Sequence, residues 1–172
     1  EAVTQYYVVS LIGKTMVILV APINTIMISY LTKKKENIDR KQYMMLVGIG
    51  AIVSIVFLMC AIIATPVFIK LFYGNKMYNS VKIIMIWVNI GQVLNMYAGF
   101  LLMLILSFTK EKWQIILQVV HLIVMVVLVL ICTYKYGIIG FAISSLFANA
   151  FRVFAVFIIG FLKINDNKEV TC

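Results

Sequence analysis

Long apolar runs separated by short polar breaks are the dominant pattern of the chain. Five runs are each long enough to cross a bilayer, which takes about 20 mostly apolar residues in a helix. They cover residues 5–31, 43–70, 80–108, 113–134 and 137–162. The runs are continuous, whereas a membrane β-barrel shows segments of about ten residues with alternating polarity. The pattern therefore predicts an all-α fold, a polytopic transmembrane helical bundle with five spans.

The breaks between the runs carry residues typical of loops and turns. Residues 72–80, "FYGNKMYNS", contain a Gly-Asn pair, and residues 133–137, "TYKYG", end in a glycine. Both patterns indicate that one helix ends and the next begins there. Residues 31–43, "LTKKKENIDRKQY", indicate a charged loop, and residues 108–113, "FTKEKW", indicate a tight hairpin.

The composition changes this picture from a helical protein to a membrane protein. Of the 172 residues, 64% are hydrophobic and 12% are charged, and the mean hydropathy is +1.08. Soluble domains are about half apolar and about one quarter charged, and a globule of this size exposes too much area to hide this apolar surface. The three cysteines, Cys60, Cys132 and Cys172, show no ligand spacing, so neither a disulfide framework nor a zinc site nor any other cofactor is indicated.

The positive charge predicts an orientation in the membrane. The chain has a net charge of +9, but its basic residues stand mostly at the ends of the apolar runs, which favours contact with anionic lipids over nucleic acid. If the loop at 33–41 is cytoplasmic, alternation places nine basic residues on the cytoplasmic side and four outside, so residue 1 is expected outside and residue 172 inside. The nine are Lys33, Lys34, Lys35, Arg40, Lys41, Lys110, Lys112, Lys163 and Lys168, and the four are Lys70, Lys76, Lys82 and Lys135.

Three of the four outer lysines, Lys70, Lys76 and Lys82, surround the Gly-Asn break against this charge bias. Either Lys70 and Lys82 extend along the helix ends to the membrane surface, or the three lysines attract a negatively charged passenger. The first residue is Glu1, and no signal-peptide pattern precedes the first run. With an odd number of spans, this predicts that the chain is a piece of a longer transporter built from paired halves.

Residues 6–31, 66–88 and 134–149 together resemble the bacterial polysaccharide flippases, a family of the multidrug/oligosaccharidyl-lipid/polysaccharide exporter superfamily. "PVFIKLFYGNKMYNSVKIIMIWV" (66–88) is similar to an outer loop and its following helix, and "YKYGIIGFAISSLFAN" (134–149) to a late glycine-rich signature, although Phe141 and Ser144 depart from small residues. "YYVVSLIGKTMVILVAPINTIMISYL" (6–31) resembles a helix that ends in a proline segment before a basic loop. The matching positions are Pro66, Leu71, Phe72, Gly74, Tyr78, Ser80, Tyr136, Gly137, Ile138, Gly140, Ala142 and Ile143.

The resemblance implies a two-lobe exporter of which residues 1–172 are a partial C-terminal lobe, without the first lobe and the first helix of this lobe. It also implies a location in the bacterial cytoplasmic membrane and a function in polysaccharide or O-antigen export. The implied substrate is an oligosaccharide linked to a polyprenyl diphosphate, which the protein would flip from the inner to the outer leaflet. Membrane lipids and the polysaccharide assembly machinery are the other implied partners.

Charged side chains inside a span are costly, at about 2.5–3.5 kcal/mol for Arg or Lys. Arg152 lies near the middle of the last run and shares a helix face with Ser145 and Asn149. Its guanidinium could hold a phosphate bidentately, or it could be satisfied by carbonyl groups or by a carboxylate from elsewhere. Lys14 lies about 10 Å inside the first run, where it could contact substrate or extend outward.

Amides form further polar stripes in the third and fourth runs. Asn89, Gln92 and Asn95 are spaced three residues apart, and Gln118 stands three residues before His121. Such amides either line a hydrated cavity or bond between helices, where each contributes about 0.6–2 kcal/mol. His121 is either a hydrogen-bonded packing residue or a proton-coupling group.

No predicted span contains a carboxylate. The six acidic residues all lie in breaks or tails and are Glu1, Glu36, Asp39, Glu111, Asp166 and Glu169. Cation-coupled drug antiporters typically need such a carboxylate, so a cationic and amide-rich lining favours a diphosphate substrate. We therefore expect a transporter rather than an enzyme, one that works by alternating access. Arg152 and Lys14 would neutralise the diphosphate, and the amides would meet sugar hydroxyls. The alternatives are a multidrug or small-molecule exporter, a membrane-embedded enzyme of polysaccharide assembly, and a non-transporting subunit.

Overall fold

Three helices account for nearly all of the chain that the structure, a computed structural model, describes, namely residues 2–33, 39–109 and 111–169. They are α1 (Ala2–Lys33), α2 (Arg40–Leu106) and α3 (Glu111–Glu169). Each contains a stretch long and apolar enough to cross a membrane. The prediction of an all-α fold is therefore confirmed over the described residues.

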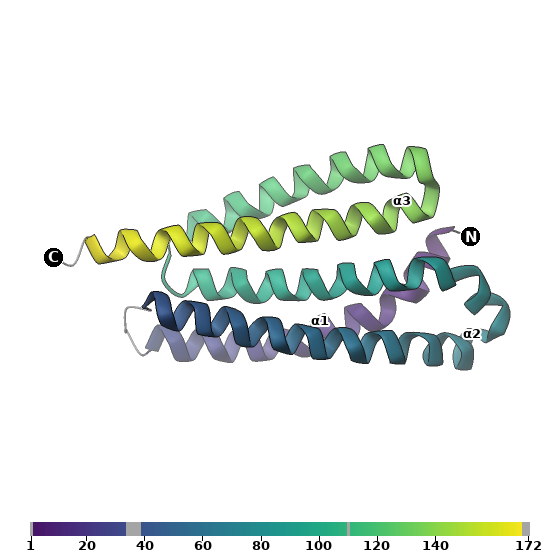
Figure 1. The fold of residues 1–172 in the computed structure, drawn as a ribbon, viewed down its shortest axis with the longest axis horizontal. Coiled ribbons are helices and arrows are strands. Elements are labelled where there is room, and N and C mark those ends of the chain that lie inside the picture. The colour runs from purple at the N-terminus through teal and green to yellow at the C-terminus, as the bar shows by residue number, and fades with distance from the viewer. Residues whose placement is uncertain (1, 34–38, 110, 170–172) are drawn as a thin grey trace.

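Helices α2 and α3 each fold back on themselves at one glycine (Figure 1). Gly74 has φ 78° and ψ 171°, and Gly137 has φ 58° and ψ −134°. Positive φ is readily adopted only by glycine, which has no Cβ to clash with the backbone. Both glycines lie in breaks that the sequence identifies as turns. We refer below to the first arm of α2 (40–73), its second arm (75–106), the first arm of α3 (111–136) and its second arm (138–169).

The helices are longer than the apolar runs that predicted them. Helix α1 continues to Lys33, α2 begins at Arg40 and α3 continues to Glu169, beyond the apolar runs that end at 31, begin at 43 and end at 162. Hydropathy marks only the apolar middle of a helix, whereas backbone hydrogen bonding continues through its polar ends. At the start of α2, for example, Tyr43 N–H donates to the Asp39 carbonyl at 2.9 Å. The centre of the predicted 31–43 loop lies outside the described residues.

The arms run alternately between two ends of the molecule (Figure 1). One end, which we call the bend end, holds the start of α1 and the bends at Gly74 and Gly137. The opposite end holds the C-terminal part of α3, the end of α1, the start of α2 and the α2–α3 connection. Consequently the second arms of α2 and α3 run parallel to each other, a relation on which the candidate site depends.

Apolar side chains fill the space between the arms and also cover much of the outside. Near the bend end, Val8 and Val9 of α1 pack with Ile69, Val81 and Ile84 of α2. A second cluster joins the far parts of α2 and α3 and contains Leu101, Leu102, Ile105, Leu117 and Val156. On the first arm of α3, exposed apolar side chains include Ile115, Ile116, Val119, Leu122, Ile123 and Leu130. So large an apolar exterior is compatible with a lipid environment.

Candidate functional site

Arg152 is the only arginine inside the apolar runs, and the second arm of α3 carries it into the helix packing. Its side chain is 9% exposed, and its Nη1 donates a hydrogen bond to Asn95 Oδ1 at 2.9 Å. Asn95 belongs to the second arm of α2, so the bond joins the two parallel arms. The charge of Arg152 thus meets the oxygen of a neutral amide.

A second bond joins the same two arms one helical turn away. Asn149 Nδ2 donates to the Gly91 carbonyl oxygen at 3.0 Å, and Asn149 is buried. A methyl group at Gly91 would lie 3.5 Å from the backbone of Leu146, so the two helices approach closely here. Because the arms are parallel, the pairs Asn149–Gly91 and Arg152–Asn95 follow each other in the same order.

His121 brings the first arm of α3 to the same place. Its imidazole lies within interaction distance of the Asn149 and Arg152 side chains. Its Nε2 atom is buried and has no hydrogen-bond partner among the described residues. We call the side chains of Asn95, His121, Asn149 and Arg152 together with the Gly91 carbonyl the arginine cluster.

The arginine cluster is a cationic site that neutral groups surround. A guanidinium carries five N–H donors in a fixed planar fork, and the one described bond to a side chain uses Nη1. Among the described residues, no carboxylate is paired with Arg152. A low-dielectric surrounding strengthens the attraction of such a cation for an anion, and the fork matches the oxygens of a phosphate or carboxylate. The arrangement can therefore hold an anionic group if one reaches it.

The other two amides of the predicted stripe on α2 have different surroundings. Asn89 is 1% exposed, and its Nδ2 donates to Thr65 Oγ1 at 3.1 Å, which joins the two arms of α2. Gln92 packs against α1, since a methyl group at Gly13 would lie 2.5 Å from its Cβ. At 100° per residue, positions 89 and 95 are about 120° apart around the helix. The three amides therefore face three different neighbours instead of one common cavity.

Two other predicted site residues lie outside the arginine cluster. Lys14 is exposed, and its Nζ lies 4.8 Å from the centre of the Tyr7 ring. Gln118 is also exposed and lines a hollow of about 460 Å³ with Leu106, Glu111, Gln114, Ile115 and Val119. The structure thus brings together four of the eight predicted site residues, Asn95, His121, Asn149 and Arg152.

Sequence reasoning missed the backbone and hydroxyl partners of these amides. The Gly91 carbonyl accepts from Asn149, but a backbone acceptor has no side chain that a sequence pattern can reveal. Thr65 pairs with Asn89 across the bend in α2, at a separation of 24 residues. A single threonine in an apolar run is usually bonded within its own helix, and Thr65 Oγ1 does also contact the Ala61 carbonyl at 2.7 Å.

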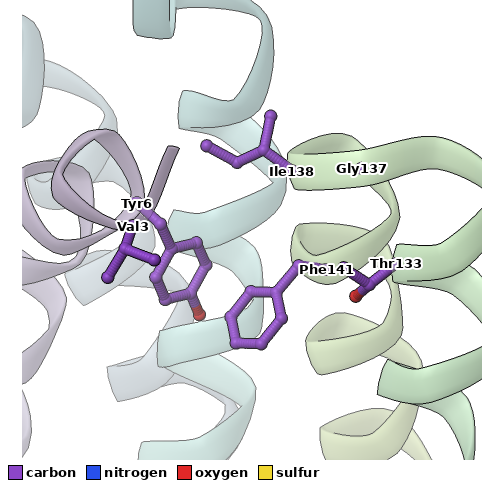
Figure 2. A pocket seen from close by; sticks show the side chains of 6 residues that line it. All are labelled: Val3, Tyr6, Thr133, Gly137, Ile138 and Phe141. Carbon is purple, nitrogen blue, oxygen red and sulfur yellow. The ribbon is translucent and has the colours of Figure 1, made fainter. Parts of the chain in front are cut away.

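A separate hollow of about 270 Å³ lies at the bend end, between the start of α1 and the bend in α3 (Figure 2). The Tyr6 and Phe141 rings meet edge to face there, with centroids 4.6 Å apart. Thr133 Oγ1 is buried and has no hydrogen-bond partner among the described residues. The lining is otherwise apolar, as in a packing defect between helices, and its residues are Val3, Tyr6, Thr133, Gly137, Ile138 and Phe141.

The described residues contain no group of three or more His, Cys, Asp or Glu side chains that could hold a metal ion. No protein-family model matches the chain, and no curated protein or solved structure matches it either. The resemblance to polysaccharide flippases therefore stays a prediction from the quoted motifs, and the arginine cluster is the structural feature on which a functional proposal can be built.

Proposed function

We propose that the chain is part of a membrane transporter that flips a lipid-linked oligosaccharide across the bacterial cytoplasmic membrane. The observation that carries this proposal is the enclosed charge of Arg152, whose described side-chain partner is the neutral amide of Asn95. The polyprenyl diphosphate of the substrate is the anion that this cation would meet.

The energetic balance at Arg152 supports a role beyond packing. Inserting an arginine at the centre of a spanning helix costs about 2.5–3.5 kcal/mol. One hydrogen bond between a charged group and a neutral one returns about 1.5–3 kcal/mol, and interhelical bonds in membranes generally return less. An apolar residue would therefore stabilise the packing at least as well as Arg152 does. A diphosphate that replaced the Asn95 amide as partner would remove this deficit while it is bound.

The proposed topology has five spans, one from α1 and one from each arm of α2 and α3. Helix α2 has 67 residues and α3 has 59. Half of either length gives an arm of roughly 45–50 Å at 1.5 Å per residue, which exceeds the roughly 30 Å of a bilayer core. The distribution of Lys and Arg favours a bend end outside and residue 172 inside. In this proposal the chain is a partial C-terminal lobe of a two-lobe exporter.

In the proposed mechanism, the two arms that carry the arginine cluster separate and close again within this lobe while the two lobes rock against each other. Arg152 and Asn149 lie on one arm, and their partners Asn95 and Gly91 lie on another, so separating these arms frees the guanidinium. The diphosphate then occupies the position of the Asn95 amide, and the sugar hydroxyls contact the freed amides. The lipid tail stays among the apolar outer faces of the helices. Closing the arms restores the Asn95 bond and releases the substrate.

A flipping assay with the full-length protein in vesicles tests the proposal. The substrate is a polyprenyl diphosphate that carries a fluorescent oligosaccharide, and an impermeant quencher reports which leaflet holds it. Arg152→Gln is expected to slow flipping at least tenfold at unchanged abundance. The matched control is Arg40→Gln, because Arg40 lies at a helix start with its guanidinium 4.0 Å from the Phe161 ring. Wild-type flipping by Arg152→Gln would overturn the proposal.

The alternative functions lack a comparable observation in the described part of the chain. A cation-coupled drug exporter needs a carboxylate in a span, and the described acids lie near helix ends. A membrane enzyme of polysaccharide assembly would pair His121 with an acid, whereas its imidazole adjoins Asn149 and Arg152. An essential carboxylate in another part of the full-length protein would favour the drug exporter.

A further inference from the structure

A polar hollow of about 380 Å³ lies at the bend end, between the start of α1 and the bend in α2. Its position differs from that of the arginine cluster, since Arg152 follows the bend at Gly137 by 15 residues, or roughly 22 Å along a helix. The transport proposal assigns no role to this hollow. Its lining residues are Thr4, Gln5, Tyr73, Lys76, Met77 and Ser80.

The structure gives the three lysines around the Gly74 bend three different environments. The Nζ of Lys70 lies 4.4 Å from the centre of the Tyr78 ring, in a cation–π contact. Lys82 is exposed and does not line the hollow. Lys76 is the cation that does line it. Of the three lysines around the bend, Lys76 lines the hollow, Lys70 lies over the Tyr78 ring and Lys82 is exposed outside the hollow.

The groups around Lys76 are suited to bind an anion through hydrogen bonds. The side chains of Thr4, Gln5 and Tyr73 can each donate a hydrogen bond. The Ser80 hydroxyl donates to the Lys76 carbonyl at 3.1 Å, which holds Ser80 on the helical turn that carries the lysine. The described lining contains no carboxylate, and Glu1, the acid closest in sequence, lies outside the described residues. An ammonium with several neutral donors is typical of phosphate recognition.

We infer that this hollow binds a phosphate group through Lys76, Tyr73, Thr4 and Gln5. The shared chemistry fits a phosphate on a lipid headgroup or a free phosphate. The bend at Gly74 is what makes the site possible, because it turns residues before and after the glycine toward the start of α1. The inference does not depend on the transport proposal, and a protein whose Arg152 proved irrelevant to flipping could still bind phosphate here.

The test uses the full chain in a phosphorus-free detergent, with ³¹P line broadening as the measure of binding. The two probes are inorganic phosphate and dihexanoyl phosphatidic acid, and competition by neutral dihexanoyl glycerol controls for binding of the acyl chains. Lys76→Gln is expected to weaken binding about tenfold, the effect of losing one charged hydrogen bond. Lys82→Gln, which removes the same charge from the same arm, is expected to bind like the wild type, and Lys76→Arg to retain most of the affinity.

Binding of both probes would show that the phosphate group suffices, and binding of phosphatidic acid alone would identify a lipid headgroup as the source. Tyr73→Phe removes one donor without changing charge and is expected to weaken binding two- to fivefold. Equal loss in Lys76→Gln and Lys82→Gln would show a diffuse charge effect and overturn the inference. Failure of both probes to bind would also overturn it.

Discussion

Three variants can separate the free energy of the hydrogen bond between Arg152 and Asn95 from the cost of burying the arginine. Asn95→Leu leaves the guanidinium without its partner at 2.9 Å, so it is expected to destabilise the fold by about 1.5–2 kcal/mol. Arg152→Met removes a cation whose insertion costs about 3 kcal/mol together with that bond. Its net effect is therefore expected to be a gain in stability of about 1–1.5 kcal/mol.

The double variant Asn95→Leu/Arg152→Met completes a cycle. When Arg152 is already replaced by methionine, Asn95→Leu leaves no guanidinium without a partner and should cost little. The two substitutions are therefore expected to show a coupling energy of about 1.5–2 kcal/mol. Reversible unfolding in mixed micelles, followed by circular dichroism, measures all four proteins. Gln118→Leu is the control because its amide is exposed, and its effect should stay within about 0.5 kcal/mol. Additive single effects, or strong destabilisation by Arg152→Met, would refute the reasoning that Arg152 is not retained for stability.

Two further predictions test the packing with the same unfolding assay. A Cβ at Gly140 would collide with the Cys132 carbonyl oxygen, whereas one at Gly99 would meet nothing within 4 Å. Gly140→Ala should therefore cost about 2–3 kcal/mol of stability or prevent folding, and Gly99→Ala should be neutral or stabilising. Equal effects of the two substitutions would contradict the close contact at the α3 bend. Thr133→Val removes a buried hydroxyl that lacks a described partner, so it should stabilise the fold by about 1 kcal/mol. Thr65→Val breaks the bond to Asn89, so it should destabilise the fold by about 1 kcal/mol. Effects of the same sign at both threonines would contradict this difference.

The course of the helices could be read from the sequence because two strong local signals agree. Uninterrupted apolar residues predict helices, and Gly74 and Gly137 stand in polar breaks where the chain has to adopt positive φ. The helix ends were harder to predict from the sequence, because a helix such as α3 continues through residues as polar as Lys163 and Glu169. Apolarity reports where a helix is surrounded by apolar groups, and hydrogen bonding decides where it stops.

The partners within the candidate site depend on tertiary contacts that no local pattern contains. Arg152 and Asn95 are separated by 57 residues, and their pairing follows from two arms running parallel after two bends. The shared face of Asn149 and Arg152 was predictable from helical spacing, because both project from one side of one helix. The same spacing also places Asn89 and Asn95 on different sides of α2, but it does not reveal which neighbour packs against each side.

The central claim is that a phosphorylated headgroup reaches Arg152 during transport, although the side chain is 9% exposed in this conformation. The most direct measurement is reaction of Arg152→Cys with an anionic methanethiosulfonate, in a full-length protein whose Cys60, Cys132 and Cys172 are replaced by alanine. The account predicts modification of this cysteine from at least one side of the membrane, because the position has to become accessible to an anion during transport. No modification from either side, while Lys76→Cys in the same background reacts, would contradict it.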